Sequence, residues 1–238
     1  MRIRTLCVVA GLMAGVGLWS TGCHSAGSGR SDVMTPERQR SMTPDMVLAE
    51  LKAGNERFVR NQSTEQHWLA QAEATATAQF PKAIVLGCLD SRVPPEVVFD
   101  QGIGDIFVGR VAGNFANEDL IGSMEFGTKL VGARLIVVLG HTQCGAVMGA
   151  IDGAEMGNLT QTLSNIKPAI AEVSYTRGER TSSNEDFVMR VTEANVRRTV
   201  REIEQRSQVI SDLVRQGDLR IVGAVYELET GRVRWLDL

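Results

Sequence analysis

The sequence predicts an α/β fold: a mostly parallel central β-sheet with flanking helices, an antiparallel C-terminal hairpin strand and an N-terminal helical arm. Three observations support this prediction. Short apolar runs rich in branched residues recur along the chain, as is typical of strands buried on both faces. Helical stretches alternate with these runs, which favours parallel strands joined by right-handed crossovers. After the last long run, the turn sequence "ETG" and a second short strand indicate a hairpin.

Length and composition indicate one globular domain. The chain has 238 residues, 43% of them hydrophobic, which is enough for a sizeable core. The net charge is -3 and the isoelectric point is about 5.7. A nucleic-acid-binding surface is strongly basic and clustered, so we expect no nucleic-acid partner.

Residues 1–22 are predicted to be a signal peptide. Two arginines precede an apolar run over 6–18, and the small residues of "STGC" follow it. The run is too short to span a bilayer comfortably, and a buried first helix is the alternative. "STGC" is also similar to a bacterial lipobox, in which the thiol of Cys23 is lipidated. We therefore expect export to the periplasm or cell envelope, with a lipid anchor at Cys23 that holds the protein at a membrane surface.

Residues 23–42 are predicted to be a flexible tether, because their glycine, serine and charged residues offer little surface to bury. The folded domain then spans 43–238. Of the four cysteines, only Cys88 and Cys144 fall within it. In an exported protein, the simplest interpretation of two cysteines is one disulfide, and a more specific pattern is needed to displace it.

The domain begins with a helix over 43–61, in which Thr43 is suited to the N-cap and Pro44 to the first turn. The segment 184–216 carries apolar residues at steps of three and four, which predicts one long helix packed on the sheet. The remaining predicted elements are buried strands at 83–87, 105–109 and 134–140, a helix at 117–131 capped by Asn117, and the hairpin strands 219–228 and 232–238.

Reactive side chains follow two of the predicted central strands. Cys88, Asp90 and Arg92 follow the strand 83–87, and His141 and Cys144 follow the strand 134–140. Open parallel sheets bind ligands in the crevice beyond the carboxyl ends of their strands. We therefore expect both groups to meet at one edge of the sheet.

The residue types of this cluster suit zinc. Two thiolates and one imidazole, from Cys88, Cys144 and His141, form a known ligand set for zinc with a fourth position open. Asp90 is either the fourth ligand or a group that faces the open position. Arg92 decides between these roles, because its guanidinium binds a carboxylate through two parallel hydrogen bonds and would hold it off the metal.

Taken together, "CLDSR" and "HTQC" resemble the β-class carbonic anhydrases, whose pattern is Cys-x-Asp-x-Arg followed by His-x-x-Cys. The resemblance extends from about residue 43 to the end. It includes the segments "GNERF", "RVPPEVVFDQGIGDIFVGRVAGN", "LIVVLGHTQCGAV" and "LRIVGAVYELETGRV". Two separated motifs with matching surroundings are far more specific than one short pattern.

The resemblance implies one Zn²⁺ per chain, bound by Cys88, His141 and Cys144, with Asp90 and Arg92 as a catalytic dyad. Asp90 would also be able to bind zinc in a closed state. The implied reaction is the reversible hydration of carbon dioxide to bicarbonate and a proton, by attack of zinc-bound hydroxide. The implied assembly is a homodimer or tetramer.

The resemblance also assigns a structural role to three glycines, which would let the backbone turn tightly around the metal: Gly87, Gly140 and Gly145. Leu89 stands where the family commonly has serine. Because that residue binds no metal, the change affects the expected pocket wall and not the expected ligands.

Three alternatives stay open at this level. The same residues would serve a hydrolase acting on a related small molecule such as carbon disulfide. A non-catalytic surface protein with structural zinc would keep Asp90 permanently in the fourth position. A Cys88–Cys144 disulfide would exclude metal altogether.

Overall fold

The computed structural model describes residue 30 and residues 32–237, and the structural statements below refer to those residues. The predicted signal peptide and Cys23 lie outside them. Among the described residues, no helix is both long and apolar enough to cross a membrane.

A five-stranded mixed sheet forms the centre of the fold, in the order β2-β1-β3-β4-β5. The first four strands are parallel and the last pair is antiparallel, which confirms the predicted fold class. The strands are β1 (Ala83–Gly87), β2 (Ile106–Arg110), β3 (Leu135–His141), β4 (Arg220–Tyr226) and β5 (Val233–Trp235).

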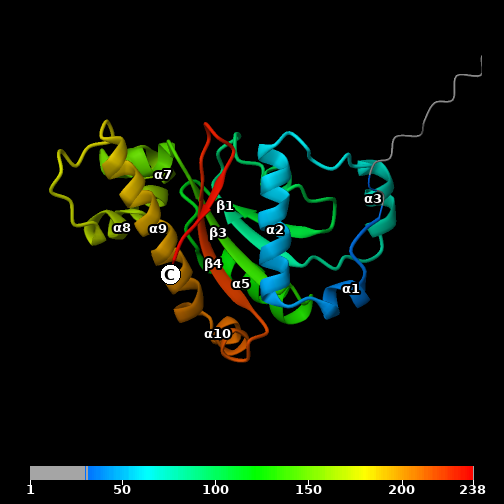
Figure 1. Cartoon of the computed structure of the whole chain (residues 1–238). Coiled ribbons are helices and arrows are strands. Elements are labelled where there is room, and N and C mark those ends of the chain that lie inside the picture. The colour runs from blue at the N-terminus through cyan, green and yellow to red at the C-terminus, as the bar shows by residue number, and fades with distance from the viewer. Residues whose placement is uncertain (1–29, 31, 238) are drawn as a thin grey trace, which may run out of the picture.

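Helices cover both faces of this sheet (Figure 1). On one face, α2 and α4 pack against every second residue of β1, β3 and β4. On the other face lie α5, α9 and α10. The helices are α1 (Pro36–Ser41), α2 (Pro44–Val59), α3 (Trp68–Thr75), α4 (Pro95–Val98), α5 (Glu118–Glu125), the π-helix η1 (Phe126–Leu130), α6 (Gly145–Ile151), α7 (Gly157–Ser164), α8 (Lys167–Glu172), α9 (Glu185–Arg206) and α10 (Gln208–Arg215).

The central strands β1 and β3 are neighbours in the sheet and are buried along their whole length. Their register places Gly87 beside Leu139, so both strands end at the same edge. We call this the carboxyl edge and the opposite end of the parallel strands the amino edge. The expectation that β2 is fully buried is wrong: as an edge strand, it pairs on one side only and its residues are partly exposed.

The long helix expected over 184–216 is two helices, α9 and α10. At Ser207 the backbone is extended, with φ -123° and ψ 108°. The Ser207 hydroxyl accepts a hydrogen bond from Ile210 N and donates one to Glu125 Oε1. Apolar residues continue in helical steps through this break, which is why the periodicity did not reveal it.

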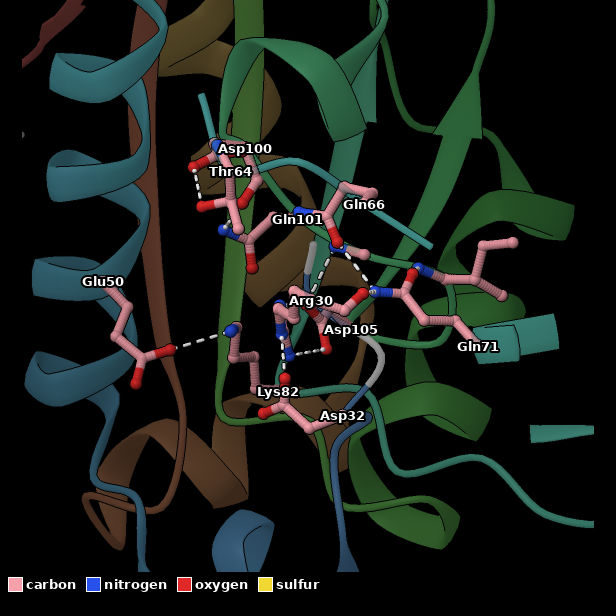
Figure 2. A network of polar contacts seen from close by, with 12 residues as sticks. Arg30, Asp32, Glu50, Thr64, Gln66, Gln71, Lys82, Asp100, Gln101 and Asp105 are labelled. Carbon is pink, nitrogen blue, oxygen red and sulfur yellow. Dashed lines mark hydrogen bonds and ion pairs between the residues drawn. The ribbon is translucent and has the colours of Figure 1, made fainter. Parts of the chain in front are cut away.

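The flexible tether expected over 23–42 is wrong for residues 32–42, which are folded against the domain. Met34 and Met42 are 3% and 4% exposed, and α1 lies between them with Thr35 as its N-cap. Gln39 donates hydrogen bonds to two backbone carbonyls of the domain. Ahead of this segment, Arg30 reaches the buried Asp105 (Figure 2). Burial of two methionines and the hydrogen bonds of Gln39 thus hold this largely polar stretch against the domain.

Candidate metal centre

Three donor side chains meet at the carboxyl edge. Cys88 follows β1, His141 ends β3, and Cys144 is the N-cap residue of α6. Their ligand atoms all lie within 4.8 Å of one another, and the three residues are 5%, 0% and 1% exposed. The two sulfur atoms are 3.9 Å apart, far beyond the disulfide bond length of about 2.05 Å. The structure therefore brings the residues after β1 and β3 together, as predicted. Cys88 and Cys144 are free thiols.

The imidazole of His141 is oriented for metal binding. Its Nδ1 lies 2.8 Å from the carbonyl oxygen of Thr142. A carbonyl only accepts, so Nδ1 carries the proton and Nε2 has a free lone pair. That buried Nε2 has no hydrogen-bond partner among the described residues. A buried acceptor without a partner is costly, and a metal ion beside the two sulfurs satisfies it. The donor set therefore fits zinc.

The contact between the two thiols favours loss of the proton from Cys88. The hydrogen bond from Cys144 lowers the pKa of the Cys88 thiol, and the same contact raises the pKa of Cys144. The Cys88 sulfur is thus the one that more readily becomes a thiolate, the form that binds a metal cation. The second thiol must release its proton when a metal binds, which makes metal binding depend on pH.

Asp90 lies beside the three donors but is paired with Arg92. The guanidinium donates from Nε to Oδ1 at 2.9 Å and from Nη2 to Oδ2 at 2.7 Å, and the Arg92 backbone N–H donates to Oδ1. These hydrogen bonds hold the pKa of the Asp90 carboxyl well below its ordinary value. Asp90 Oδ2 is 3.9 Å from His141 Nε2. The carboxylate is therefore ionised and close to the donor group, but directed to the arginine.

Two further residues, which the sequence motifs did not include, hold this loop in place: Arg110 ends β2, and Gly113 follows that strand. Arg110 donates from Nε to the Cys88 carbonyl at 2.8 Å and from Nη2 to the Asp90 carbonyl. Gly113 donates its backbone N–H to Cys88 Sγ at 3.4 Å. The signal available in the sequence was positional: the end of β2 lies at the same edge as the ends of β1 and β3.

The role expected for the three glycines is wrong. None of Gly87, Gly140 and Gly145 has a positive φ. Gly140 is needed for packing instead, because a Cβ there would lie 2.8 Å from Val196 Cγ2 on α9. Space remains for a Cβ at the other two positions.

Comparison with known sequences agrees with this geometry. Residues 83–233 match the family model described as carbonic anhydrase. Carbonic anhydrase 2 of Mycobacterium tuberculosis is 37% identical over 187 residues, covering 76% of this chain and 87% of that protein. The carbonic anhydrase of Mycolicibacterium smegmatis is 38% identical over 189 residues, covering 77% of this chain and 88% of that protein.

Solved structures show the same fold. A β-carbonic anhydrase of Coccomyxa in complex with acetazolamide has a TM-score of 0.63 at 23% identity, covering 81% of this chain and 85% of that chain. One of two tetrameric β-carbonic anhydrases from Sordaria macrospora has a TM-score of 0.61 at 21% identity, covering 82% and 95%. With the family match, the relatives and the fold in agreement, the chain belongs to the β-class carbonic anhydrases.

Proposed function

We propose that this protein catalyses the reversible hydration of carbon dioxide to bicarbonate and a proton, at one zinc ion held by Cys88, His141 and Cys144. The observation that carries the proposal is the donor group itself, with an orphaned imidazole nitrogen facing two sulfurs. Family membership supports the reaction. Bound zinc supplies Lewis-acid chemistry that lowers the pKa of a water molecule.

In this proposal the chain's own groups orient the nucleophile. Asp90, kept ionised by Arg92, accepts a hydrogen bond from the attacking water and so fixes the direction of its lone pair. Arg92 Nη2 also lies 3.4 Å from the carbonyl of Gln143, so it links the loop after β1 to the loop after β3. Arg92 thereby positions the carboxylate relative to the metal ligands on both strands.

The test is stopped-flow measurement of carbon dioxide hydration, with metal content determined on the same sample. About one zinc per chain and turnover well above the buffer rate are expected. Zinc without turnover would favour the structural-zinc alternative, and hydrolysis of carbon disulfide without hydration would favour the related hydrolase. The Asp90–Arg92 pairing argues against the structural-zinc alternative, because both Asp90 oxygens accept hydrogen bonds from Arg92. It does not distinguish hydration from hydrolysis, which would use the same residues.

We also propose that a second copy of the chain covers the edge strand β2. An apolar cavity of about 270 Å³ lies along it, lined in part by Phe107, Leu120 and Phe126. Phe126 and Leu130 on η1 are 50% and 76% exposed. Contiguous exposed apolar residues commonly mark interfaces between proteins. Light scattering coupled to gel filtration should give a dimer or tetramer, and a monomer at working concentration would contradict this.

Export and lipidation at Cys23 remain a proposal from the sequence, supported by the charged start, the apolar run and "STGC". Cys23→Ser should move the protein from the membrane fraction to the soluble fraction without changing its activity. Mass spectrometry of the wild type should find a lipid on Cys23. A wild type without lipid would contradict the anchor.

A further inference from the structure

The sulfur of Cys88 has a second contact besides Cys144, and this contact comes from a constrained backbone. Gly113 donates its N–H to Cys88 Sγ at 3.4 Å. It sits in a tight turn, in which Asn114 N donates to the Val111 carbonyl at 2.9 Å. The φ of Gly113 is +85°, a conformation that favours glycine. The direction of the N–H bond thus depends on what holds this turn.

Two buried side chains hold Gly113 from different elements. Asn195 on α9 is 2% exposed and donates from Nδ2 to the Gly113 carbonyl at 2.8 Å. Ile166, just ahead of α8, is fully buried, and a Cβ on Gly113 would lie 2.4 Å from its Cδ1. Gly113 is therefore hydrogen-bonded at its carbonyl and closely packed at its Cα. Only the contact from Asn195 is a hydrogen bond, so only this contact sets a direction.

We propose that Asn195 is a positioning residue that, through the Gly113 backbone, keeps a hydrogen bond on the Cys88 sulfur and so tunes this ligand for zinc. The inference rests on the zinc site proposed above. Two thiolates cancel the formal charge of Zn²⁺, which weakens it as a Lewis acid. An N–H donor draws charge from one sulfur, so less charge is given to the metal. Groups behind the direct ligands commonly set metal affinity and reactivity in this way.

The chain provides a matched control for Asn195. Thr199 lies one turn further along α9 on the same face, and is 1% exposed. Thr199→Val removes a buried polar group from the same helix. It separates a general loosening of α9 from a loss of the specific contact to Gly113.

The first measurement uses protein with cobalt in place of zinc, and follows the thiolate-to-cobalt charge-transfer band. In Asn195→Ala the sulfur donates more strongly, so the band should move to longer wavelength. In Asn195→Gln, which retains an amide donor, the band should return toward the wild-type position. Thr199→Val should lower the melting temperature without moving the band.

The second measurement needs no mutation, and so does not depend on a variant that folds. In wild-type protein loaded with cadmium-113, a scalar coupling between the metal and the Gly113 amide proton should appear across the N–H···S bond. Absence of this coupling would overturn the proposal, as would a band in Asn195→Ala at the wild-type position. An equal band shift in Thr199→Val would also overturn it. Wild-type protein that binds no metal would instead refute the zinc site itself.

Discussion

The two ends of the parallel sheet differ in what their buried side chains bind. Besides the Asp90–Arg92 pair, the carboxyl edge holds buried atoms with lone pairs available to a ligand: the sulfurs of two free cysteines and the Nε2 of His141. At the amino edge, charges are paired with one another. Buried Asp105 is bound by Arg30, and buried Lys82 by Glu50, as Figure 2 shows.

This difference suits the carboxyl edge to ligand binding and the amino edge to stabilising the fold. A group whose hydrogen-bonding capacity is already used holds segments together but has nothing left for a ligand. A group left open costs stability until a ligand satisfies it. Changes at the carboxyl edge should therefore affect activity and metal content most, and changes at the amino edge should affect the free energy of unfolding most.

The largest effect is expected from loss of a metal ligand. Cys144→Ala should lose zinc and fall to the uncatalysed rate, and it should also unfold more easily, since metal binding free energy adds to folding free energy. Metal analysis, stopped-flow hydration and urea unfolding check this. Leu89→Ser is the control, because Leu89 follows Cys88 directly but is 66% exposed. It should keep zinc and activity. Zinc retained in Cys144→Ala would contradict the assignment.

The next largest effect is expected at Arg92, again on activity. Without its guanidinium, Asp90 is free to turn toward the donor group and occupy the open position. Arg92→Ala should keep its zinc and lose about 10²-fold or more in rate. Arg190→Ala is the matched control, because it breaks a similar Arg–Asp pair between side chains that are 42% and 49% exposed on α9. Full activity in Arg92→Ala would refute this role.

At the amino edge, Asp105→Ala should leave the zinc content unchanged and lower the free energy of unfolding by about 3–5 kcal/mol. It removes a fully buried carboxylate and leaves Arg30, whose side chain is 17% exposed, without its main partner. Urea unfolding of the zinc-loaded protein measures the change. Asp218→Ala breaks the exposed pair with Arg134 nearby and should cost under about 1 kcal/mol. Equal losses in both variants would erase the distinction between buried and exposed pairs.

The smallest effect is a pH dependence at the same edge. Burial raises the pKa of Glu50, but hydrogen bonds and charge from Lys82 and Arg38 outweigh it, so the pKa is lowered overall. A lowered pKa contributes stability above the unfolded value of about 4.3, and this stability is lost as pH falls through the folded value. The difference in urea midpoint between wild type and Glu50→Gln should thus be constant near neutral pH and shrink below about pH 4. A difference that grows on acidification would contradict the sign.

The central strands and the donor group were predictable because both depend on local patterns. The predicted strand 83–87 matches β1 at both ends, and the predicted strand 134–140 differs from β3 by one residue at each end. Short apolar runs between polar residues mark such strands sharply. Once parallel strands are placed, their carboxyl ends must share an edge. Cys88 and His141 then come together although 53 positions separate them.

The parts that escaped prediction depend on tertiary contacts. Nothing near Asn195 in the sequence signals that its amide reaches Gly113, 82 residues earlier. The folding of residues 32–42 depends on where Met34 and Met42 find buried space, which composition does not record. At the helix break, Ser207 donates a hydrogen bond to Glu125 on α5, 82 residues earlier in the chain. Local periodicity carries no information of this kind.

The two outer strands of the sheet, β2 and β5, differ in a way that matters for solubility. An open strand edge is a template on which further chains can add, and proteins avoid endless addition by making edges short and charged. The β5 edge has only three residues, and its central Arg234 is paired with Glu193 on α9. The β2 edge is longer and more apolar. If two copies meet there about a twofold axis, each subunit uses the longer open edge of the sheet that the structure describes, and the contact closes on itself instead of growing into a fibre.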